Sequence, residues 1–197
     1  SILSHCVSAD FDEARLVLGH CSQLVKSVVE LFSNLVSKKL QISIHQQIKQ
    51  LGTADAVKSA EIESLEGDVI ILNGDHPLIT VQDLNGFLAD FRELKLDLAV
   101  ITVTLDHPKE FGRIIKSSGQ LKAIVESKDA SAETLKIKEV NTGIYIVKAE
   151  ILQKYLPRIK NENSKGEFYL TDLVSLAIED EKKVQSVEVK NKMVAHG

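Results

Sequence analysis

The chain has 197 residues, which is enough for one domain with a sizeable apolar core. Hydrophobic residues make up 44% of it, charged residues make up 26%, and the net charge is −4 with both signs interspersed. This composition excludes a basic nucleic-acid-binding surface, and no apolar run approaches the roughly 18 residues of a membrane helix. We therefore expect no nucleic-acid partner and no membrane partner, although a local phosphate site would need only a few donors.

The chain contains two cysteines, Cys6 and Cys21, which are too few for a disulfide framework. We interpret both as thiols of a reducing compartment and expect a cytoplasmic protein without a signal peptide. The sequence starts inside the apolar pattern "SILSHCV" and without a Met, which is typical of a fragment.

Strands and helices alternate through the first half of the chain. The predicted strands cover residues 15–19, 40–46, 68–75 and 96–105, and the predicted helices cover residues 22–36, 53–65 and 80–94. This alternation indicates a mostly parallel sheet with right-handed crossovers. Within 68–75, the apolar run over residues 69–72 is typical of a strand that is buried on both faces.

Two of these helices carry further signals. The helix over 80–94 begins with the capping-box pattern Thr80-x-x-Asp83. The helix over 22–36 gathers four apolar side chains on one face: Leu24, Val28, Leu31 and Leu35.

The second half of the chain has a different pattern. Two short strands over 112–127 surround Ser117-Ser118-Gly119, which predicts a hairpin. The elements expected after it are a strand over 138–148, helices over 149–159 and 168–180, and a strand over 183–189. We expect one domain with two lobes, about 1–106 and about 107–197.

The stretch "ILNGDHPLIT", residues 71–80, follows a buried strand. Asn73-Gly74 is a hairpin signal, but the proline after His76 and the helix start at Thr80 favour a strand, a loop and a helix. Asp75 then lies at the carboxyl edge of the sheet, where it either binds a hard cation such as Mg²⁺ or caps the turn. His76 points away from Asp75 on an extended chain, so we interpret it as a wall or packing residue.

Three other stretches place polar residues at the ends or breaks of elements. In residues 46–57, Gly52 and Thr53 precede a helix N-terminus, which suits an anion or a base edge. Residues 141–143, Asn-Thr-Gly, interrupt an apolar strand, which a bulge or a bound sugar hydroxyl would explain. Residues 167–172 crowd polar groups at another helix start.

In this order, the four stretches resemble the sugar nucleotidyltransferase family, in particular the uridyltransferase domain of bacterial N-acetylglucosamine-1-phosphate uridyltransferase. The resemblance extends from about residue 15 to 190 and rests on "QLGTADAV", "ILNGDHPLIT", "FGRIIKSSGQLKAIVESKDAS", "EVNTGIYIV" and "KGEFYLTDLVSLA". It implies a Rossmann-like α/β nucleotidyltransferase fold with a mixed, mostly parallel sheet and helices on both faces. The lobe over about 1–106 would bind nucleotide, and the smaller, hairpin-containing lobe over about 107–197 would bind sugar.

The resemblance also implies roles for the nucleotide side. Gln47 matches the position that reads the uracil edge, and Gly52 and Thr53 match those that hold the nucleoside. Asn73-Gly74 replaces the aromatic-Gly pair of the family, with Asn in place of the usual Tyr. Asp75 matches the family's catalytic aspartate, which binds Mg²⁺ near the α-phosphate.

On the sugar side, the matching residues are Gly112, Glu126, Asn141, Tyr169 and Thr171. The implied reaction joins UTP and N-acetylglucosamine 1-phosphate into UDP-N-acetylglucosamine and pyrophosphate by in-line attack on the α-phosphate. The sugar phosphate is already an anionic nucleophile, so no general base is needed and alignment and charge neutralisation suffice.

Three family features are missing from this sequence: the N-terminal Gly-rich loop that clamps the triphosphate, an Asn that completes the metal site, and the C-terminal acetyltransferase β-helix. We therefore expect this chain alone to be inactive or nearly so, and expect a trimer only in a full-length parent. The alternatives are a related nucleotidyltransferase with another sugar or base, a degenerate domain that only binds nucleotide sugar, and a purely structural α/β domain.

Overall fold

The computed structural model describes residues 2–19, 22–36, 39–76 and 78–195. The α-helices are α1 (Ile2–Ser8), α2 (Ser22–Val36), α3 (Thr53–Lys58), α4 (Val81–Glu93), α5 (Ala149–Tyr155) and α6 (Asp172–Glu179). The strands are β1 (Glu13–Leu18), β2 (Gln41–Gln46), β3 (Asp68–Ile71), β4 (Leu98–Thr104), β5 (Arg113–Ser117), β6 (Gln120–Val125), β7 (Glu139–Lys148) and β8 (Val184–Glu188). Short 3₁₀ turns are η1 (Ile62–Ser64), η2 (Thr134–Lys136), η3 (Leu156–Arg158) and η4 (Lys192–Ala195).

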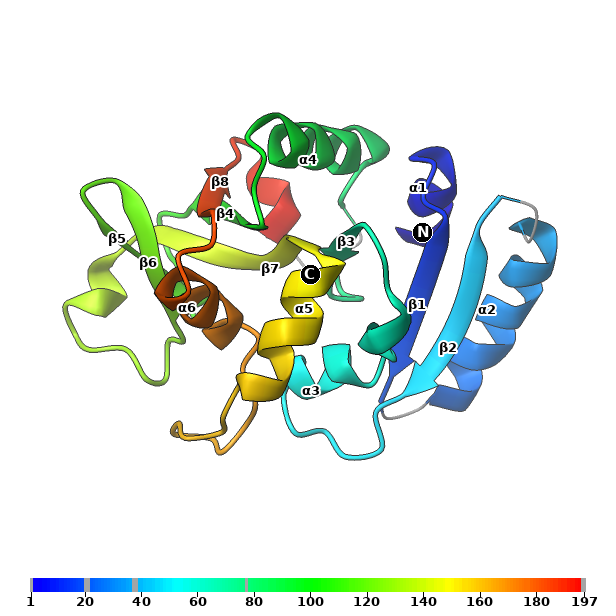
Figure 1. Cartoon of the computed structure of the whole chain (residues 1–197), viewed down its shortest axis with the longest axis horizontal. Helices are drawn as coiled ribbons and strands as arrows, with labels where there is room; N and C mark the ends of the chain where they lie inside the picture. Colours follow the sequence, from blue (N-terminus) through cyan, green and yellow to red (C-terminus); the bar gives the residue numbers. More distant parts are fainter. Residues whose placement is uncertain (1, 20–21, 37–38, 77, 196–197) are drawn as a thin grey trace.

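The strands form a large mixed sheet and a separate pair (Figure 1). The large sheet has the order β6-β5-β7-β4-β8, and β3 also pairs with β7. The predicted mixed α/β architecture is confirmed, but β7 runs antiparallel to β3, β4 and β5, so the large sheet contains fewer parallel pairs than expected. The reason is that β7 follows the β5–β6 hairpin and not a helical crossover.

Helices cover both faces of the large sheet, as the resemblance implies. Alternate residues of β4 point to opposite faces: Leu98 and Val100 pack in a cluster with α3, α5 and α6, whereas Ala99 and Ile101 pack in a cluster with α4. Figure 1 shows α4 on one side of the sheet and α5 and α6 on the other. The prediction of a buried strand over 96–105 is therefore confirmed by two apolar cores, one on each face.

β3 differs from its prediction. It ends at Ile71, its residues are only half-buried, and among the described strands it is hydrogen-bonded to β7 alone. β1 likewise pairs only with β2 in the described part of the chain. The expectation that 68–75 forms a strand buried on both faces is confirmed in part. Val69 and Ile71 pack against one core and Ile70 packs against the other, but the strand is shorter than predicted and its residues are only half-buried.

Two local predictions are confirmed in atomic detail. Thr80 caps α4: its hydroxyl accepts from the Asp83 N–H over 3.1 Å, and the Asp83 carboxylate accepts from the Thr80 N–H over 2.9 Å. The β5–β6 hairpin turns through Ser118 at φ 50° and Gly119 at φ 78°, the positive values that two-residue hairpins prefer. The helices predicted over 53–65 and 168–180 are shorter, as α3 ends at Lys58 and α6 begins at Asp172.

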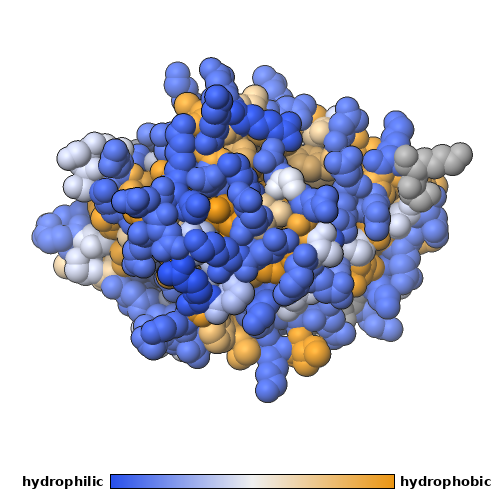
Figure 2. Space-filling model, viewed as in Figure 1, coloured by the Kyte–Doolittle hydropathy of each residue, from blue (hydrophilic) through white to orange (hydrophobic). Residues whose placement is uncertain are grey.

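The apolar face predicted for α2 is not its packing face. Val28, Leu31 and Leu35 are 67%, 70% and 83% exposed, whereas Val29 is buried at 5%. The helix carries two adjacent apolar stripes, and the one that contains Val29 and the half-buried Phe32 is the less exposed. Apart from such positions, the face drawn in Figure 2 is mainly hydrophilic.

Within the described residues, no helix combines the length and the apolarity that a bilayer span requires. Cys6 is a free, half-buried thiol whose pKa is raised by burial. Cys21 lies outside the described residues.

Candidate functional site

Four predicted sugar-binding residues meet where β5, β6, β7 and the start of α6 come together. The backbone N–H of Asn141 donates to the Gly112 carbonyl oxygen over 2.9 Å. A Cβ atom at Gly112 would lie 3.0 Å from Ile124 Cγ2 and in ordinary contact, at 3.5 Å, with both carboxylate oxygens of Glu126, so Gly112 lies directly beside the carboxylate. The Thr171 hydroxyl donates to Glu126 Oε1 over 3.3 Å. Residues far apart in the sequence thus form one cluster around Glu126.

Glu126 is half-buried and carries the negative charge of this cluster. Burial is the largest influence on the Glu126 carboxyl group and raises its pKa. The hydrogen bond from Thr171 and the positive charge of Lys165 lower this pKa, while Asp129 and Asp172 raise it further. Hydrogen bonds from a ligand would stabilise the ionised form, so this carboxylate is suited to accept from hydroxyl groups.

The polar break in β7 is a β-bulge, one of the two explanations that the sequence left open. The register between β4 and β7 shifts between Val100 and Thr102, which pair with Tyr145 and Asn141. Asn141 Nδ2 donates to the Tyr145 hydroxyl over 2.7 Å, and Asn141 Oδ1 accepts from the Gly143 N–H over 2.9 Å. These bonds hold the Asn141 amide in one orientation beside the Glu126 cluster.

The predicted nucleoside-binding segment is hydrogen-bonded to the segment that leads into α6. The Phe168 N–H donates to the Leu51 carbonyl over 2.7 Å, and the Ala54 N–H donates to the Phe168 carbonyl over 2.9 Å. The Leu170 N–H donates to Thr53 Oγ1 over 2.9 Å. Two stretches that the sequence singled out separately therefore form one structural unit.

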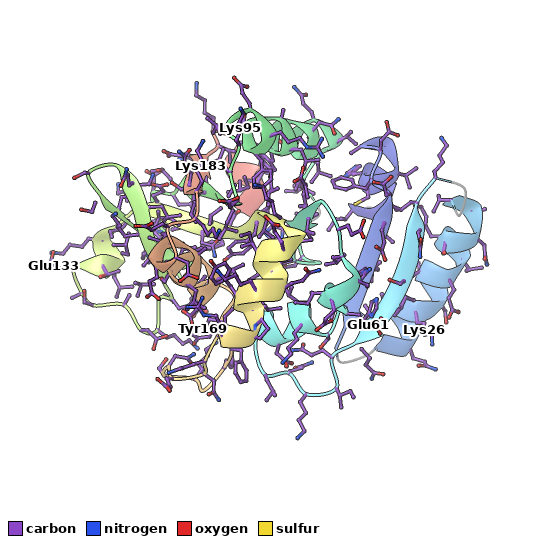
Figure 3. The ribbon with its side chains drawn as sticks, in the orientation of Figure 1. Lys26, Glu61, Lys95, Glu133, Tyr169 and Lys183 are labelled. Atoms are coloured by element: carbon purple, nitrogen blue, oxygen red, sulfur yellow. The ribbon has the colours of Figure 1, made fainter. Side chains whose placement is uncertain are left out.

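Gly52 is required at the centre of this unit. Its φ is +117°, and a Cβ atom there would lie 2.5 Å from the Phe168 carbonyl oxygen. Only glycine has both the conformational freedom and the small size for this position. Tyr169 follows Phe168 at 9% exposure and lines a hollow with Glu126 and Lys165; Figure 3 labels Tyr169 near the start of α6.

The Gln47 side chain lies against the same unit. Its Nε2 donates to the Gly52 carbonyl over 3.1 Å and to Asp55 Oδ2 over 2.7 Å. Among the described residues, both hydrogen bonds of this side chain use Nε2. The amide nitrogen of Gln47 thus faces two protein acceptors. The amide oxygen points the other way and is available to accept from a ligand N–H.

The predicted metal segment is the open part of the site. Asn73, Gly74 and Asp75 are exposed, and the Asp75 side chain is 76% exposed. A Cβ atom at Gly143 would lie only 2.5 Å from Asn73 Nδ2, so this segment reaches the β7 bulge. The described residues contain no group of three metal-ligating side chains. A lone exposed carboxylate fits Mg²⁺ that is bound by one or two carboxylates together with substrate phosphates.

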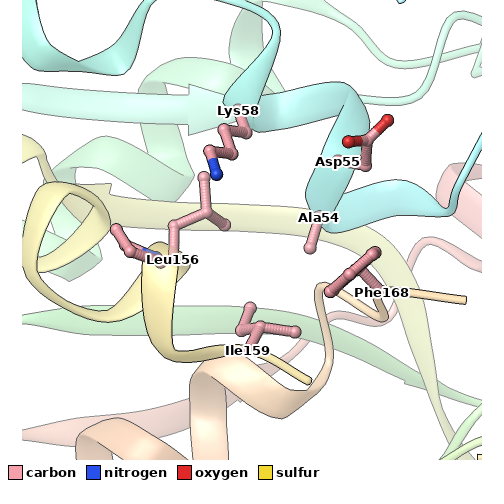
Figure 4. Close-up of a pocket in the computed structure, with 7 residues that line it drawn as sticks. Ala54, Asp55, Lys58, Leu156, Ile159 and Phe168 are labelled. Atoms are coloured by element: carbon pink, nitrogen blue, oxygen red, sulfur yellow. The ribbon is translucent and has the colours of Figure 1, made fainter. Parts of the chain in front are cut away.

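Two small hollows border these residues. One, of about 70 Å³, is lined by Glu110, Glu126, Ser127, Lys128, Lys165 and Tyr169. The other, of about 80 Å³, lies between α3 and η3 (Figure 4), where Lys58 extends toward Leu156. Both are far smaller than the roughly 300–1,000 Å³ of a typical ligand pocket.

Sequence reasoning did not single out two residues that hold the site together: Tyr145 and Phe168. The spacing Asn141-x₃-Tyr145 was a usable signal, because residues four apart on a strand share a face. Phe168 acts through its backbone, which no side-chain pattern reveals. His76 was expected to be a wall or packing residue, and it is buried at 4%, but both of its ring nitrogens also approach carbonyl oxygens.

Comparison with known proteins identifies relatives over nearly the whole chain. A bifunctional protein GlmU from Bdellovibrio bacteriovorus is 51% identical over 176 residues, which cover 89% of this chain and 37% of that protein. The bifunctional protein GlmU of Alkaliphilus oremlandii is 41% identical over 165 residues, 83% of this chain and 34% of that protein. The chain thus spans little more than a third of the length of these curated relatives.

Solved structures share the fold. A putative glucose-1-phosphate thymidylyltransferase from Bacillus anthracis superposes with a TM-score of 0.74 at 19% identity, over 95% of this chain and 72% of that one. A UDP-glucose pyrophosphorylase complexed with UDP-glucose superposes with a TM-score of 0.70 at 15% identity, over 95% and 77%. The sequence profile described as nucleotidyl transferase matches residues 1–193, and the chain belongs to the nucleotidyl transferase family.

Proposed function

We propose that the natural protein that carries this chain transfers a uridylyl group from UTP to N-acetylglucosamine 1-phosphate. The products are UDP-N-acetylglucosamine, a precursor of the bacterial cell wall, and pyrophosphate. We propose further that residues up to about 106 bind the nucleotide and later residues bind the sugar. The reaction would occur in the cytoplasm, and this chain alone would be a monomer.

One observation carries the proposal: the Glu126 cluster and the Asp75 segment meet at the β7 bulge. Asn141 belongs to the cluster and bonds Gly143, and Gly143 leaves the space that Asn73 occupies. A sugar held at Glu126 and a phosphate held near Asp75 would then lie side by side. This arrangement suits a reaction in which two phosphates must be aligned.

On the sugar side, Glu126 would accept from sugar hydroxyl groups, and Gly112 would leave the space for them. Asn141, Tyr169 and Thr171 would line the same pocket. Buried hydrogen-bonding groups discriminate strongly against ligands that leave them unpaired, so these residues would set the choice of sugar.

On the nucleotide side, the amide oxygen of Gln47 would accept the N3–H of uracil, while Gly52 and Thr53 hold the nucleoside close to the backbone. Asn73 and Gly74 would contact the nucleotide beside Asp75. Asp75 would hold Mg²⁺, which neutralises charge on the phosphates as they approach each other. The chain's own contribution is to position both substrates, because the attacking sugar phosphate is already ionised.

Pyrophosphate release by the natural protein tests the proposal. We expect rapid, Mg²⁺-dependent release with UTP and N-acetylglucosamine 1-phosphate, and slow release when glucose 1-phosphate replaces the sugar phosphate. The same assay should be run on the isolated 197-residue chain, for which we expect little or no turnover. Normal turnover by the isolated chain would show that its own residues suffice for triphosphate binding.

A related thymidylyltransferase is the second candidate, because a single acceptor at Gln47 cannot distinguish uracil from thymine, which share the N3–H donor. A comparison of UTP, TTP, CTP and GTP separates the two. If turnover is faster with TTP than with UTP, the proposed reaction is thymidylyl transfer and not uridylyl transfer.

A further inference from the structure

His76 is a buried residue at the end of an exposed segment. Asn73, Gly74 and Asp75 are exposed, whereas His76 is exposed to only 4%. Its neighbour Asp75 has a side chain that is 76% exposed, and the two side chains approach within 3.6 Å at His76 Nδ1 and Asp75 Oδ1. The imidazole is therefore the anchored end of a segment that otherwise faces solvent.

The His76 ring bridges two parts of the fold. Nε2 lies 2.8 Å from the carbonyl oxygen of Thr142 in β7, and Nδ1 lies 3.1 Å from the carbonyl oxygen of Asn73. A carbonyl oxygen can only accept, so a ring nitrogen must donate to form either bond. The Thr142 contact is the shorter and spans 66 positions of the sequence. Only a ring that carries a proton on Nε2 can form it.

The acceptor end of this bond is rigid. The Thr142 hydroxyl donates to the Ile101 carbonyl of β4 over 2.7 Å, and Thr142 is exposed to only 2%. Gly143, which follows, has a φ of +82°, and a Cβ atom there would lie 3.6 Å from His76 Cε1. The His76 ring and the Asn73 side chain thus lie against a bulge that is fixed to the neighbouring strand.

We propose that His76 is a positioning residue that fixes the Asp75 segment on β7, and thereby sets the distance between the metal-binding carboxylate and the sugar-binding Asn141. The bond from His76 Nε2 to Thr142 ends one residue from Asn141. Because Asp75 precedes His76, movement of the ring away from β7 moves the carboxylate with it. The inference rests on the proposed function for the roles of Asp75 and Asn141, but the ring contact itself does not.

The ring contact is tested first, without any ligand. Long-range nitrogen–proton NMR spectra of the chain should show His76 protonated on Nε2; a ring protonated on Nδ1 alone would overturn the proposal. The N–H of residue 76 donates to the Asn73 carbonyl over 3.4 Å, and the Gly143 N–H donates to Asn141 Oδ1 over 2.9 Å. In His76→Leu, hydrogen exchange at these two amides should accelerate about five- to tenfold. His76→Gln places an amide donor near the former Nε2 position and should recover most of the protection. The control His107→Leu removes an exposed histidine and should change none of these amides.

Metal binding is tested second. The apparent affinity for Mg²⁺, measured by calorimetry in the presence of UDP-N-acetylglucosamine, should fall about tenfold in His76→Leu and recover in His76→Gln. A lower melting temperature in His76→Leu with unchanged Mg²⁺ affinity would reduce His76 to a packing residue and overturn the proposal. If His76→Leu does not fold, His76→Phe replaces it in both measurements. A Mg²⁺ affinity and an exchange pattern in His76→Phe that both match wild type would then overturn the proposal.

The two measurements separate this inference from the proposed function. If the wild-type chain and the natural protein bind neither Mg²⁺ nor nucleotide sugar, the proposed function fails. The hydrogen-exchange result still decides whether His76 fixes residues 73–76 to β7.

Discussion

The sugar side and the metal side of the candidate site differ in how much of their structure is already formed. The sugar side consists of half-buried and buried groups with intrachain partners, as Glu126, Asn141 and Thr171 illustrate. On the proposed metal side, the side chain of Asp75 is exposed, and His76 is the one basic side chain within 4 Å of its carboxylate among the described residues. In the proposed function, one half of the site is preorganised by the fold, whereas the other half would be completed by a metal ion and phosphates.

This difference suits the chemistry of the two proposed ligands. A sugar is neutral and is distinguished by hydroxyl positions, so its acceptors must be fixed before it binds. Magnesium keeps several waters and shares its ligands with phosphates, so a partly solvated carboxylate serves it well. Substitutions on the two sides should therefore fail in different ways.

Asp75→Asn should have the largest effect on activity. The amide removes the charge that holds Mg²⁺, and we expect kcat/KM of the natural protein to fall about 1,000-fold, or about 4 kcal/mol. The free energy of unfolding should stay within about 0.5 kcal/mol of the wild-type value, because the Asp75 side chain is exposed. Steady-state pyrophosphate release and urea denaturation measure the two quantities. Activity within a few-fold of wild type would contradict the proposal that Asp75 binds the metal ion.

Gly52→Ala should disrupt the contact between the predicted nucleoside-binding segment and the segment that leads into α6. The new Cβ would lie 2.5 Å from the Phe168 carbonyl oxygen at a φ of +117°, and we expect a loss of about 2–4 kcal/mol of unfolding free energy. Gly67→Ala is the matched control, because Gly67 also has a positive φ, +72°, but has open space around its Cβ position. Gly67→Ala should lower the free energy of unfolding by no more than about 1 kcal/mol. Equal losses in urea denaturation would exclude the proposed steric conflict.

Glu126→Gln should weaken sugar binding while it stabilises the fold. The loss of a charged acceptor should raise KM for the sugar phosphate about 10- to 100-fold with a smaller change in kcat. Burial raises the pKa of Glu126 in the folded chain above its value in the unfolded chain. The native state therefore loses stability as the pH rises from the ordinary carboxyl pKa to the raised pKa of the folded chain. The variant should therefore melt at a higher temperature than wild type near neutral pH. This difference should vanish at acid pH, where Glu126 is protonated in both the folded and the unfolded chain. A lower melting temperature at neutral pH would contradict this assignment.

Thr80→Ala should have the smallest effect and should spare both sides. It removes the capping box of α4, and we expect a loss of about 1 kcal/mol of stability by urea denaturation. The binding affinity for UDP-N-acetylglucosamine should not change. A parallel loss of affinity would mean that α4 positions the ligand-binding residues.

Local and chemical features of this molecule could be predicted from the sequence. The Thr80 capping box, the hairpin at Ser118-Gly119 and the buried strand β4 depend on neighbouring residues, and all three are confirmed. The direction of β7 and the exposed stripe on α2 could not be predicted, because they depend on which strand or sheet an element meets after the chain folds.

The same distinction holds for the candidate site. The segments that carry it were recognised from residue types, but their connections were not. The bond from the Leu170 N–H to Thr53 Oγ1 spans 117 positions, and the ring contact of His76 spans 66. Contacts of that span leave no periodic signal, and the histidine contact runs to a backbone atom that is identical in every residue.

The most direct test of the contrast between the two sides is calorimetric titration with UDP-N-acetylglucosamine, with and without Mg²⁺, on wild type, Glu126→Gln and Asp75→Asn. We predict that Glu126→Gln weakens binding about equally in both conditions, and that Asp75→Asn leaves metal-free binding intact but abolishes the effect of Mg²⁺. If Asp75→Asn weakened metal-free binding, or if Glu126→Gln did so only when Mg²⁺ is present, the account of a preorganised sugar side and a metal-completed side would be contradicted.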